Sequence, residues 1–100
     1  MKTAFRVKNW LPVQFMPKSQ FTDAYASFIK VLIAARKHAG VSQVELGKRV
    51  GRDQPFISLV ENGVRRVDII EFCALARGIG RDPAELLAEI QTHLPAQIEI

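Results

Sequence analysis

The 100-residue sequence contains one cysteine and no long apolar run. A single cysteine excludes an intrachain disulfide and a cysteine-rich metal site, and it suits a reducing compartment. No apolar stretch approaches the roughly 18 residues that span a bilayer. Near the N-terminus, Arg6, Lys8 and Asn9 interrupt the place where a secretory signal needs a continuous apolar stretch. We therefore predict a cytoplasmic protein with no membrane association.

The sequence also lacks the groupings of residues that enzymes and metal proteins require. It has no nucleophile beside a candidate base, no glycine-rich phosphate loop and no paired carboxylates. His38 and His93 have no cysteine, aspartate or histidine neighbours at metal-ligand spacing, so we predict no metal site and no cofactor. The sequence favours a binding protein over an enzyme.

Apolar residues make up 48% of the chain and charged residues 24%, which is the balance of a single soluble domain. The net charge of +4 is unevenly distributed. Residues 1–18 carry four basic and no acidic side chains, and residues 36–66 carry seven basic against three acidic ones. Residues 67–100, in contrast, carry six acidic and two basic side chains. A polyanionic partner would therefore bind the first two-thirds of the chain.

Helix start and stop signals predict five short helices and an all-α fold. Two helices open with the pattern of a capping box, in which Ser42 precedes Glu45 and Asp68 precedes Glu71 by three residues. The predicted helices run from Thr22 to Gly40, from Ser42 to Gly51, from Asp53 to Asn62 and Gly63, from Asp68 to Gly80, and from Asp82 to Pro95.

Apolar residues recur at three- and four-residue spacing, which predicts the inward face of each helix. Cys73 lies among apolar neighbours, so we expect an inert core thiol. The predicted inward positions are Tyr25, Phe28, Ile29, Leu32, Arg36 and Ala39 in the first helix, Phe72, Leu75, Ala76 and Ile79 in the fourth, and Leu86, Leu87, Ile90 and Leu94 in the fifth.

Residues 43–62 read as two short helices joined by a tight turn. Helices that cross steeply need a small residue where they approach and a residue that tolerates positive φ in the turn. Gly47 and Gly51 meet these two needs. Apolar residues that would pack between the two helices and fix their crossing, here called the α-helical corner, lie at consistent offsets, at Leu46, Val50, Ile57 and Val60. The pattern predicts a helix-turn-helix.

Three stretches of the chain, ARKHAGVSQVELGKRVG, RDQPFISLVENGVRR and FCALARGIGRDPAELL, resemble the lambda-repressor-like helix-turn-helix proteins, also called Xre or Cro/CI-type regulators. The resemblance covers residues 19–94 and implies a five-helix DNA-binding domain. Residues 1–18 then form a basic N-terminal arm, and residues 95–100 form a C-terminal tail. The arm either contacts DNA or a second subunit, or is a free tail, and Met1 and Met16 are both candidate translation starts.

The resemblance also implies roles for individual residues. Gln43 stands where the family contacts a phosphate, and Gln54 stands where the recognition helix first meets a base. Arg36 and Glu61 match a buried ion pair between the first and third helices. Chemistry agrees, because glutamine can pair with the N6 and N7 atoms of adenine and helix N-termini attract phosphates.

Some positions depart from the family pattern. Gly47 replaces the more usual alanine, and Arg52 occupies a position that is often apolar. Pro55, Phe56 and Leu59 lie among the outward-facing positions of the third helix, so we expect contacts with thymine methyl groups or recognition of DNA shape. The alternative for Phe56 is that it folds back against the domain. The predicted DNA-binding residues are Gln43, Arg52, Gln54, Pro55, Phe56, Ser58, Leu59, Asn62, Arg65 and Arg66, with the three arginines orienting the DNA backbone.

The sequence therefore predicts a sequence-specific transcriptional regulator, a repressor associated with the nucleoid, that binds double-stranded DNA as a homodimer on a two-fold operator. The C-terminal third is the expected dimer interface, because Leu87, Ile90, Leu94 and Ile98 offer more apolar surface than one small domain covers. One alternative is an antitoxin that binds a toxin protein and represses its own promoter. Another is a bridging factor that mainly binds protein.

Overall fold

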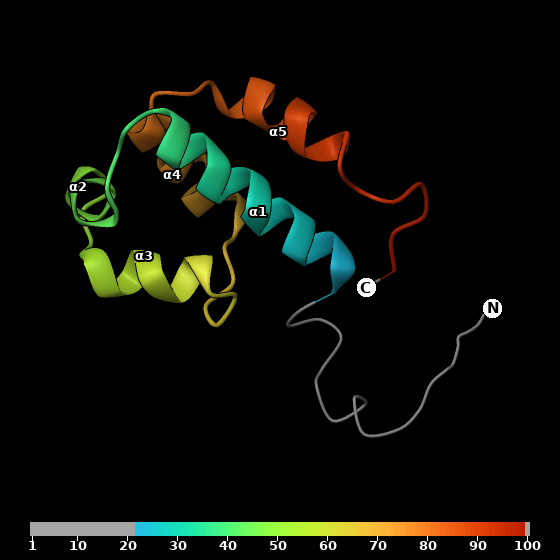
Figure 1. Ribbon diagram of the computed structural model, residues 1–100, viewed down its shortest axis with the longest axis horizontal. Coiled ribbons are helices and arrows are strands. Elements are labelled where there is room, and N and C mark those ends of the chain that lie inside the picture. The colour runs from blue at the N-terminus through green and yellow to red at the C-terminus, as the bar shows by residue number, and fades with distance from the viewer. Residues whose placement is uncertain (1–21, 100) are drawn as a thin grey trace.

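The structure is a computed structural model that describes residues 22–99 as a bundle of helices (Figure 1). The helices are α1 (Asp23–His38), α2 (Gln43–Arg49), α3 (Gln54–Glu61), α4 (Ile69–Ile79) and α5 (Pro83–Gln91). This confirms the predicted all-α, five-helix architecture. No helix in residues 22–99 is long and apolar enough to cross a membrane. The predicted arm, with the two candidate first residues Met1 and Met16, and Phe21 lie outside the described residues.

Each helix begins at the polar residue that the sequence predicted, because that side chain accepts a hydrogen bond from an otherwise unpaired backbone N–H of the first turn. The cap-to-nitrogen distances are 3.1 Å for Thr22, 3.0 Å for Ser42, 3.1 Å for Asp53, 2.7 Å for Asp68 and 3.2 Å for Asp82.

The two predicted capping boxes differ in outcome. At Asp68 the box is complete, since the backbone N–H of Asp68 also donates to Glu71 Oε1 at 3.0 Å. At Ser42 only the serine half forms. The carboxylate of Glu45 accepts instead from Arg49 Nε at 2.9 Å, one turn along the same helix face.

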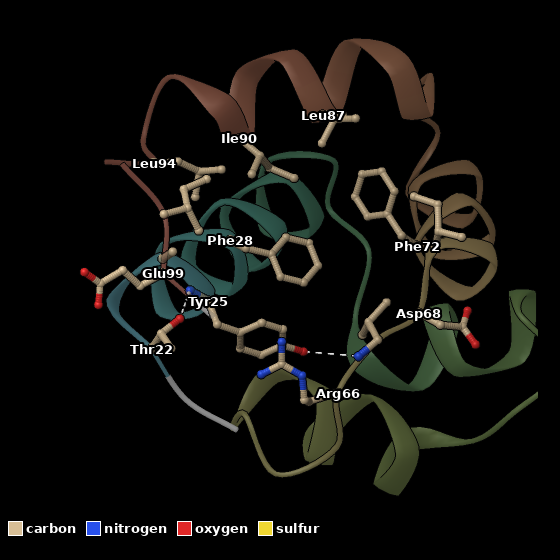
Figure 2. Close-up of a pocket in the computed structure, with 14 residues that line it drawn as sticks. Thr22, Tyr25, Phe28, Arg66, Asp68, Phe72, Leu87, Ile90, Leu94 and Glu99 are labelled. Carbon is tan, nitrogen blue, oxygen red and sulfur yellow. Dashed lines mark hydrogen bonds between the residues drawn. The ribbon is translucent and has the colours of Figure 1, made fainter. Parts of the chain in front are cut away.

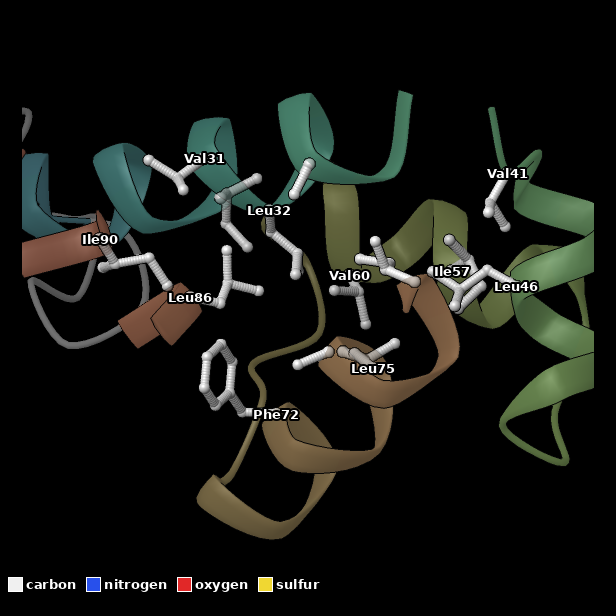
Figure 3. Packing of buried hydrophobic residues seen from close by; sticks show 14 of the residues in the cluster. Val31, Leu32, Val41, Leu46, Ile57, Val60, Phe72, Leu75, Leu86 and Ile90 are labelled. Carbon is white, nitrogen blue, oxygen red and sulfur yellow. The ribbon is translucent and has the colours of Figure 1, made fainter. Parts of the chain in front are cut away.

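The core lies where α1 packs against α3, α4 and α5, while α2 packs against α3 and α4. Figure 3 shows side chains from all five helices meeting in this core. The most deeply buried large side chains are Leu32, Leu46, Ile57, Val60, Leu75 and Leu86.

Three residues that the sequence predicted to be buried are exposed or only partly buried. Ala39 is exposed, because the helix has already ended there and Ala39 is the C-cap; Val31 and Ala35 are buried in α1 instead. Leu87 keeps 40% of its surface exposed on α5. Cys73 is half-buried in α4, outside the fully buried core.

Candidate nucleic-acid interface

The close approach of α2 and α3 depends on two glycines. A Cβ atom on Gly47 would lie 2.5 Å from the backbone carbonyl carbon of Asp53, so no larger residue fits there without moving the start of α3. Gly51 has a φ of 74°, in the left-handed region that favours glycine. Leu46, Ile57 and Val60 are each 1% exposed and close the corner. The predicted helix-turn-helix is therefore present.

A buried ion pair joins α1 to the end of α3. Arg36 Nε donates to Glu61 Oε2 at 2.6 Å, and Arg36 Nη2 donates to Glu61 Oε1 at 2.9 Å. The two side chains are only 8% and 6% exposed. Arg36 Nη1 also donates to the backbone carbonyl of Val41 at 2.8 Å, which fixes the segment between α1 and α2. The ion pair expected from the sequence is thus formed with two-pronged geometry.

The same carboxylate begins a series of hydrogen bonds that reaches the surface. Glu61 Oε1 accepts from Gln43 Nε2 at 2.8 Å, and Gln43 Oε1 accepts from Gln54 Nε2 at 2.8 Å. Since a primary amide carries two N–H groups and a carbonyl oxygen, Gln54 keeps one N–H and its oxygen for another partner. The two glutamines predicted to contact DNA are therefore held against each other, an arrangement that sequence spacing alone did not show.

The exposed face of α3 carries four of the other predicted contact residues. Pro55 is exposed, and Leu59 keeps 46% of its surface in solvent. Asn62 Nδ2 donates to Ser58 Oγ at 3.3 Å, so these two polar side chains lie side by side one turn apart. The face is mixed, with apolar and polar groups arranged beside Gln54.

Phe56 is a correction to the predicted set of DNA contacts. Its side chain is only 6% exposed, and it lies with Val50, Ala74 and Leu75 around a small cavity toward α4. Its position one residue before Ile57 and four before Val60 places it on the inward half of α3. Phe56 thus folds back against the domain, the alternative left open for it.

The buried ring of Phe56 supports two of the three predicted phosphate-orienting arginines. The guanidinium carbon of Arg52 lies 4.0 Å from the ring centroid, and that of Arg65 lies 5.3 Å from it. Both distances fall within the range of cation–π attraction. Neither arginine is therefore a freely moving surface charge.

Arg65 has a second anchor in Glu71, which sequence reasoning missed as a partner. Arg65 Nη2 and Nη1 donate to the two carboxylate oxygens at 2.6 and 3.0 Å. These hydrogen bonds raise the pKa of Arg65 and lower the pKa of Glu71, with a further lowering from the backbone N–H of Asp68. The capping pattern predicted that Glu71 stabilises the start of α4, but nothing in the sequence indicated that it also pairs with Arg65.

Arg66 stacks on the ring of Tyr25, with its guanidinium carbon 4.1 Å from the centroid. The Tyr25 hydroxyl oxygen accepts from the backbone N–H of Val67 at 3.2 Å. Burial raises the pKa of Tyr25, against the opposing effects of that hydrogen bond and of Arg66. Tyr25 thus fixes the segment between α3 and α4 that carries Arg65 and Arg66.

Residues 22–99 contain no group of three side chains suited to hold a metal ion. In Figure 1, α3 and α5 lie on opposite sides of α1, so the acidic side chains of α5 are kept away from the predicted DNA-binding face.

Comparisons with known proteins agree with this geometry. The sequence profile of a family described as a helix-turn-helix domain matches residues 31–88. A solved structure, an XRE-family like protein from Pseudomonas syringae pv. tomato str. DC3000, is 44% identical, with a TM-score of 0.67 over 72% of this chain and 88% of that chain. No match was found among curated proteins. The chain belongs to the Xre-type helix-turn-helix family, which makes it a DNA-binding regulator and confirms the resemblance seen in the sequence.

Proposed function

We propose that the protein is a transcriptional repressor that reads a specific DNA sequence by placing α3 in the major groove. The observation that carries the proposal is the series of contacts from Arg36 through Glu61 and Gln43 to Gln54. A side chain that is already held in place loses less conformational freedom on binding than a mobile one. The series therefore prepares Gln54 to meet a base.

In this proposal the residues divide into those that read bases and those that hold the backbone. Gln54 pairs with adenine through its carbonyl oxygen and remaining N–H, and Leu59 contacts a thymine methyl group. Gln43 contacts a phosphate. The other members of the surface are Pro55, Ser58 and Asn62 beside the bases and Arg52, Arg65 and Arg66 beside the phosphates.

We propose further that two copies bind together, because one helix-turn-helix contacts few base pairs. Their recognition helices then lie about 34 Å apart, one turn of B-DNA, so the operator is an inverted repeat. Residues 19–94 are the proposed DNA-binding domain, and residues 1–18 and 95–100 remain the predicted arm and tail. Sedimentation of a monomer at high micromolar concentration, together with binding to a single half-site, would contradict the dimer.

Occupancy mapping across the genome would supply the operator, its symmetry and the regulated genes. Titrations of the operator and of a scrambled duplex then test the role of Gln54. We expect Gln54→Ala to lose about 1 to 3 kcal/mol of binding free energy on the operator and much less on the scrambled duplex. Gln91→Ala is the matched control, because Gln91 is an exposed glutamine on α5. Equal losses on both duplexes for Gln54→Ala would remove the base-reading role.

An antitoxin is a second candidate, favoured by an apolar surface near the start of α4. Val64 and Ile70 keep 69% and 73% of their surfaces exposed and lie within four residues of Asp68 along the chain, and exposed apolar patches on a soluble domain mark partner-binding surfaces. In that case Val64→Asp and Ile70→Asp would abolish co-purification with a toxin encoded beside this gene while leaving operator binding intact. Loss of operator binding in either variant would contradict a separate toxin-binding surface.

A further inference from the structure

An apolar groove lies between α1, α4 and α5. Its volume is about 320 Å³, and its lining residues come from the start of α1, the segment between α3 and α4, α4, α5 and the residues after α5. Figure 2 shows the rings of Tyr25, Phe28 and Phe72 along one wall and Leu87 and other aliphatic side chains along the other. The rings meet edge to face, with centroids 5.4 Å apart for Tyr25 and Phe28 and 5.8 Å apart for Phe28 and Phe72.

Several lining residues expose apolar surface that residues 22–99 leave uncovered. Leu87 keeps 40% of its surface exposed, Ile98 keeps 51% and Ile69 keeps 64%. Ile90, which the sequence offered for a dimer interface, is 2% exposed and already belongs to the core. Apolar patches of this kind on a small domain mark a surface that another segment covers.

We propose that residues 10–15 of the same chain, with the sequence WLPVQF, occupy this groove. The first described residue, Thr22, is itself part of the groove lining, so residues 10–15 are tethered to the groove. At about 3.3 Å per extended residue, the seven residue steps from Phe15 to Thr22 allow a separation of up to about 23 Å. The tether is thus long enough for residues 10–15 to contact lining residues beyond Thr22.

The composition of the N-terminal segment fits the groove. Of the eight aromatic residues in the chain, four lie in residues 1–21, at Phe5, Trp10, Phe15 and Phe21. Aromatic side chains favour edge-to-face contact with other rings, and the groove wall is aromatic. The lining also includes two acidic residues, Asp68 and Glu99, against one basic residue, Arg66, which suits an apolar segment whose flanking charges, Lys8 and Lys18, are basic.

The covalent tether favours this occupant over a second copy of the chain. A short linker holds residues 10–15 near the groove at a high effective concentration, and closing so short a loop costs little conformational entropy. A second copy has to be recruited from dilute solution. The groove then belongs to the folded unit and is not the dimer interface expected from the sequence.

Trp10 makes the proposal directly measurable, because it is the only tryptophan in the chain. In the full chain without DNA, we expect short-wavelength tryptophan emission and weak quenching by acrylamide. Leu87→Asp places a charge in the groove and should move the emission to the longer wavelength of a hydrated indole, with quenching increased severalfold. Ala88→Asp is the matched control, since Ala88 is exposed on the same helix and does not line the groove.

Two further measurements keep the result unambiguous. Thermal unfolding of Leu87→Asp checks that the domain is folded, and Ile98→Asp repeats the test at a residue beyond the last helix. Emission of a hydrated indole in the unmodified chain, or equal quenching in that chain and in folded Leu87→Asp, would overturn the proposal. A short-wavelength emission that disappears on dilution would also overturn it, because it would place the segment in the groove of a second copy.

Discussion

The α2–α3 corner and the apolar groove differ in what determines their shape. At the corner, a buried ion pair and a series of hydrogen bonds fix polar side chains in one arrangement. At the groove, apolar side chains define a cavity without directional contacts to its occupant. Hydrogen bonds demand particular partners at particular distances, whereas apolar contact is non-directional. The comparison is consistent with the two proposals, selective recognition of DNA at the corner and apolar contact with residues 10–15 at the groove.

The largest effect is expected at the buried ion pair. Glu61→Ala leaves the Arg36 guanidinium buried without its carboxylate, which should cost about 3 to 5 kcal/mol of unfolding free energy. Chemical denaturation measures this loss. Glu89→Gln is the control, because it removes a carboxylate from the exposed ion pair with Arg81, and we expect little change there. Similar losses in the two variants would show that water reaches the Arg36–Glu61 pair.

The next largest effect is expected at the helix crossing. Gly47→Ala forces a methyl group against the backbone of Asp53, so the start of α3 has to move, at a cost of about 1 to 3 kcal/mol. The family more often has alanine here, which makes the test informative. Gly78→Ala is the comparison, because its added methyl group would also lie too close to its neighbours, at 2.8 Å from Leu46 Cδ1 and 3.2 Å from Val50 Cγ1, but these are side-chain atoms, so we expect a smaller loss than at Gly47. A neutral Gly47→Ala would show that the crossing adjusts easily.

A smaller effect is expected at an anchored arginine. Arg65→Ala should weaken binding to the operator and to the scrambled duplex alike. The slope of log affinity against log salt concentration should become shallower by about 0.9 for each phosphate that the variant no longer neutralises. Arg81→Ala is the control, since Arg81 also forms an ion pair with a glutamate but belongs to the segment between α4 and α5. An unchanged salt slope for Arg65→Ala would mean that Arg65 only fastens the start of α4 through Glu71.

The smallest effect is a dependence of stability on pH at Glu71. The pKa of Glu71 is lowered in the folded protein, first by Arg65 and then by the N–H of Asp68. A lowered pKa means that the folded state favours the carboxylate, so this stabilisation is present above the ordinary glutamate pKa and is lost as the pH falls through the lowered value. Glu71→Gln should therefore reduce the fall in unfolding free energy at acidic pH. An identical acid profile for Glu71→Gln would contradict the ion pair, and Glu85→Gln serves as an exposed control.

Local chemistry explains which features were predictable. Caps such as Thr22 and Asp53 act on their own next turn, and the turn glycine Gly51 acts on its own backbone, so both kinds of signal are complete in the sequence. The ion pair between Arg36 and Glu61 spans 25 residues and was expected from the inward position of each residue on its helix together with the family resemblance.

The remaining features depend on packing between elements. Phe56 lies at the edge of the inward face of α3, and only the position of α4 decides which way its ring turns. The ion pair of Arg65 was also not predictable, because its partner Glu71 was already assigned to a helix cap. The hydrogen bond between Gln54 and Gln43 forms only because α2 and α3 cross closely.

A double-mutant cycle on Gln43 and Gln54 tests the organised corner most directly. Operator affinity is measured for the unmodified protein, Gln43→Ala, Gln54→Ala and the double variant, with the scrambled duplex in parallel. If Gln43 holds Gln54 for base reading, the two losses are not additive, and the coupling free energy on the operator is at least about 0.5 kcal/mol, with none on the scrambled duplex. Additive losses on the operator would show that the two glutamines act independently and would contradict the account.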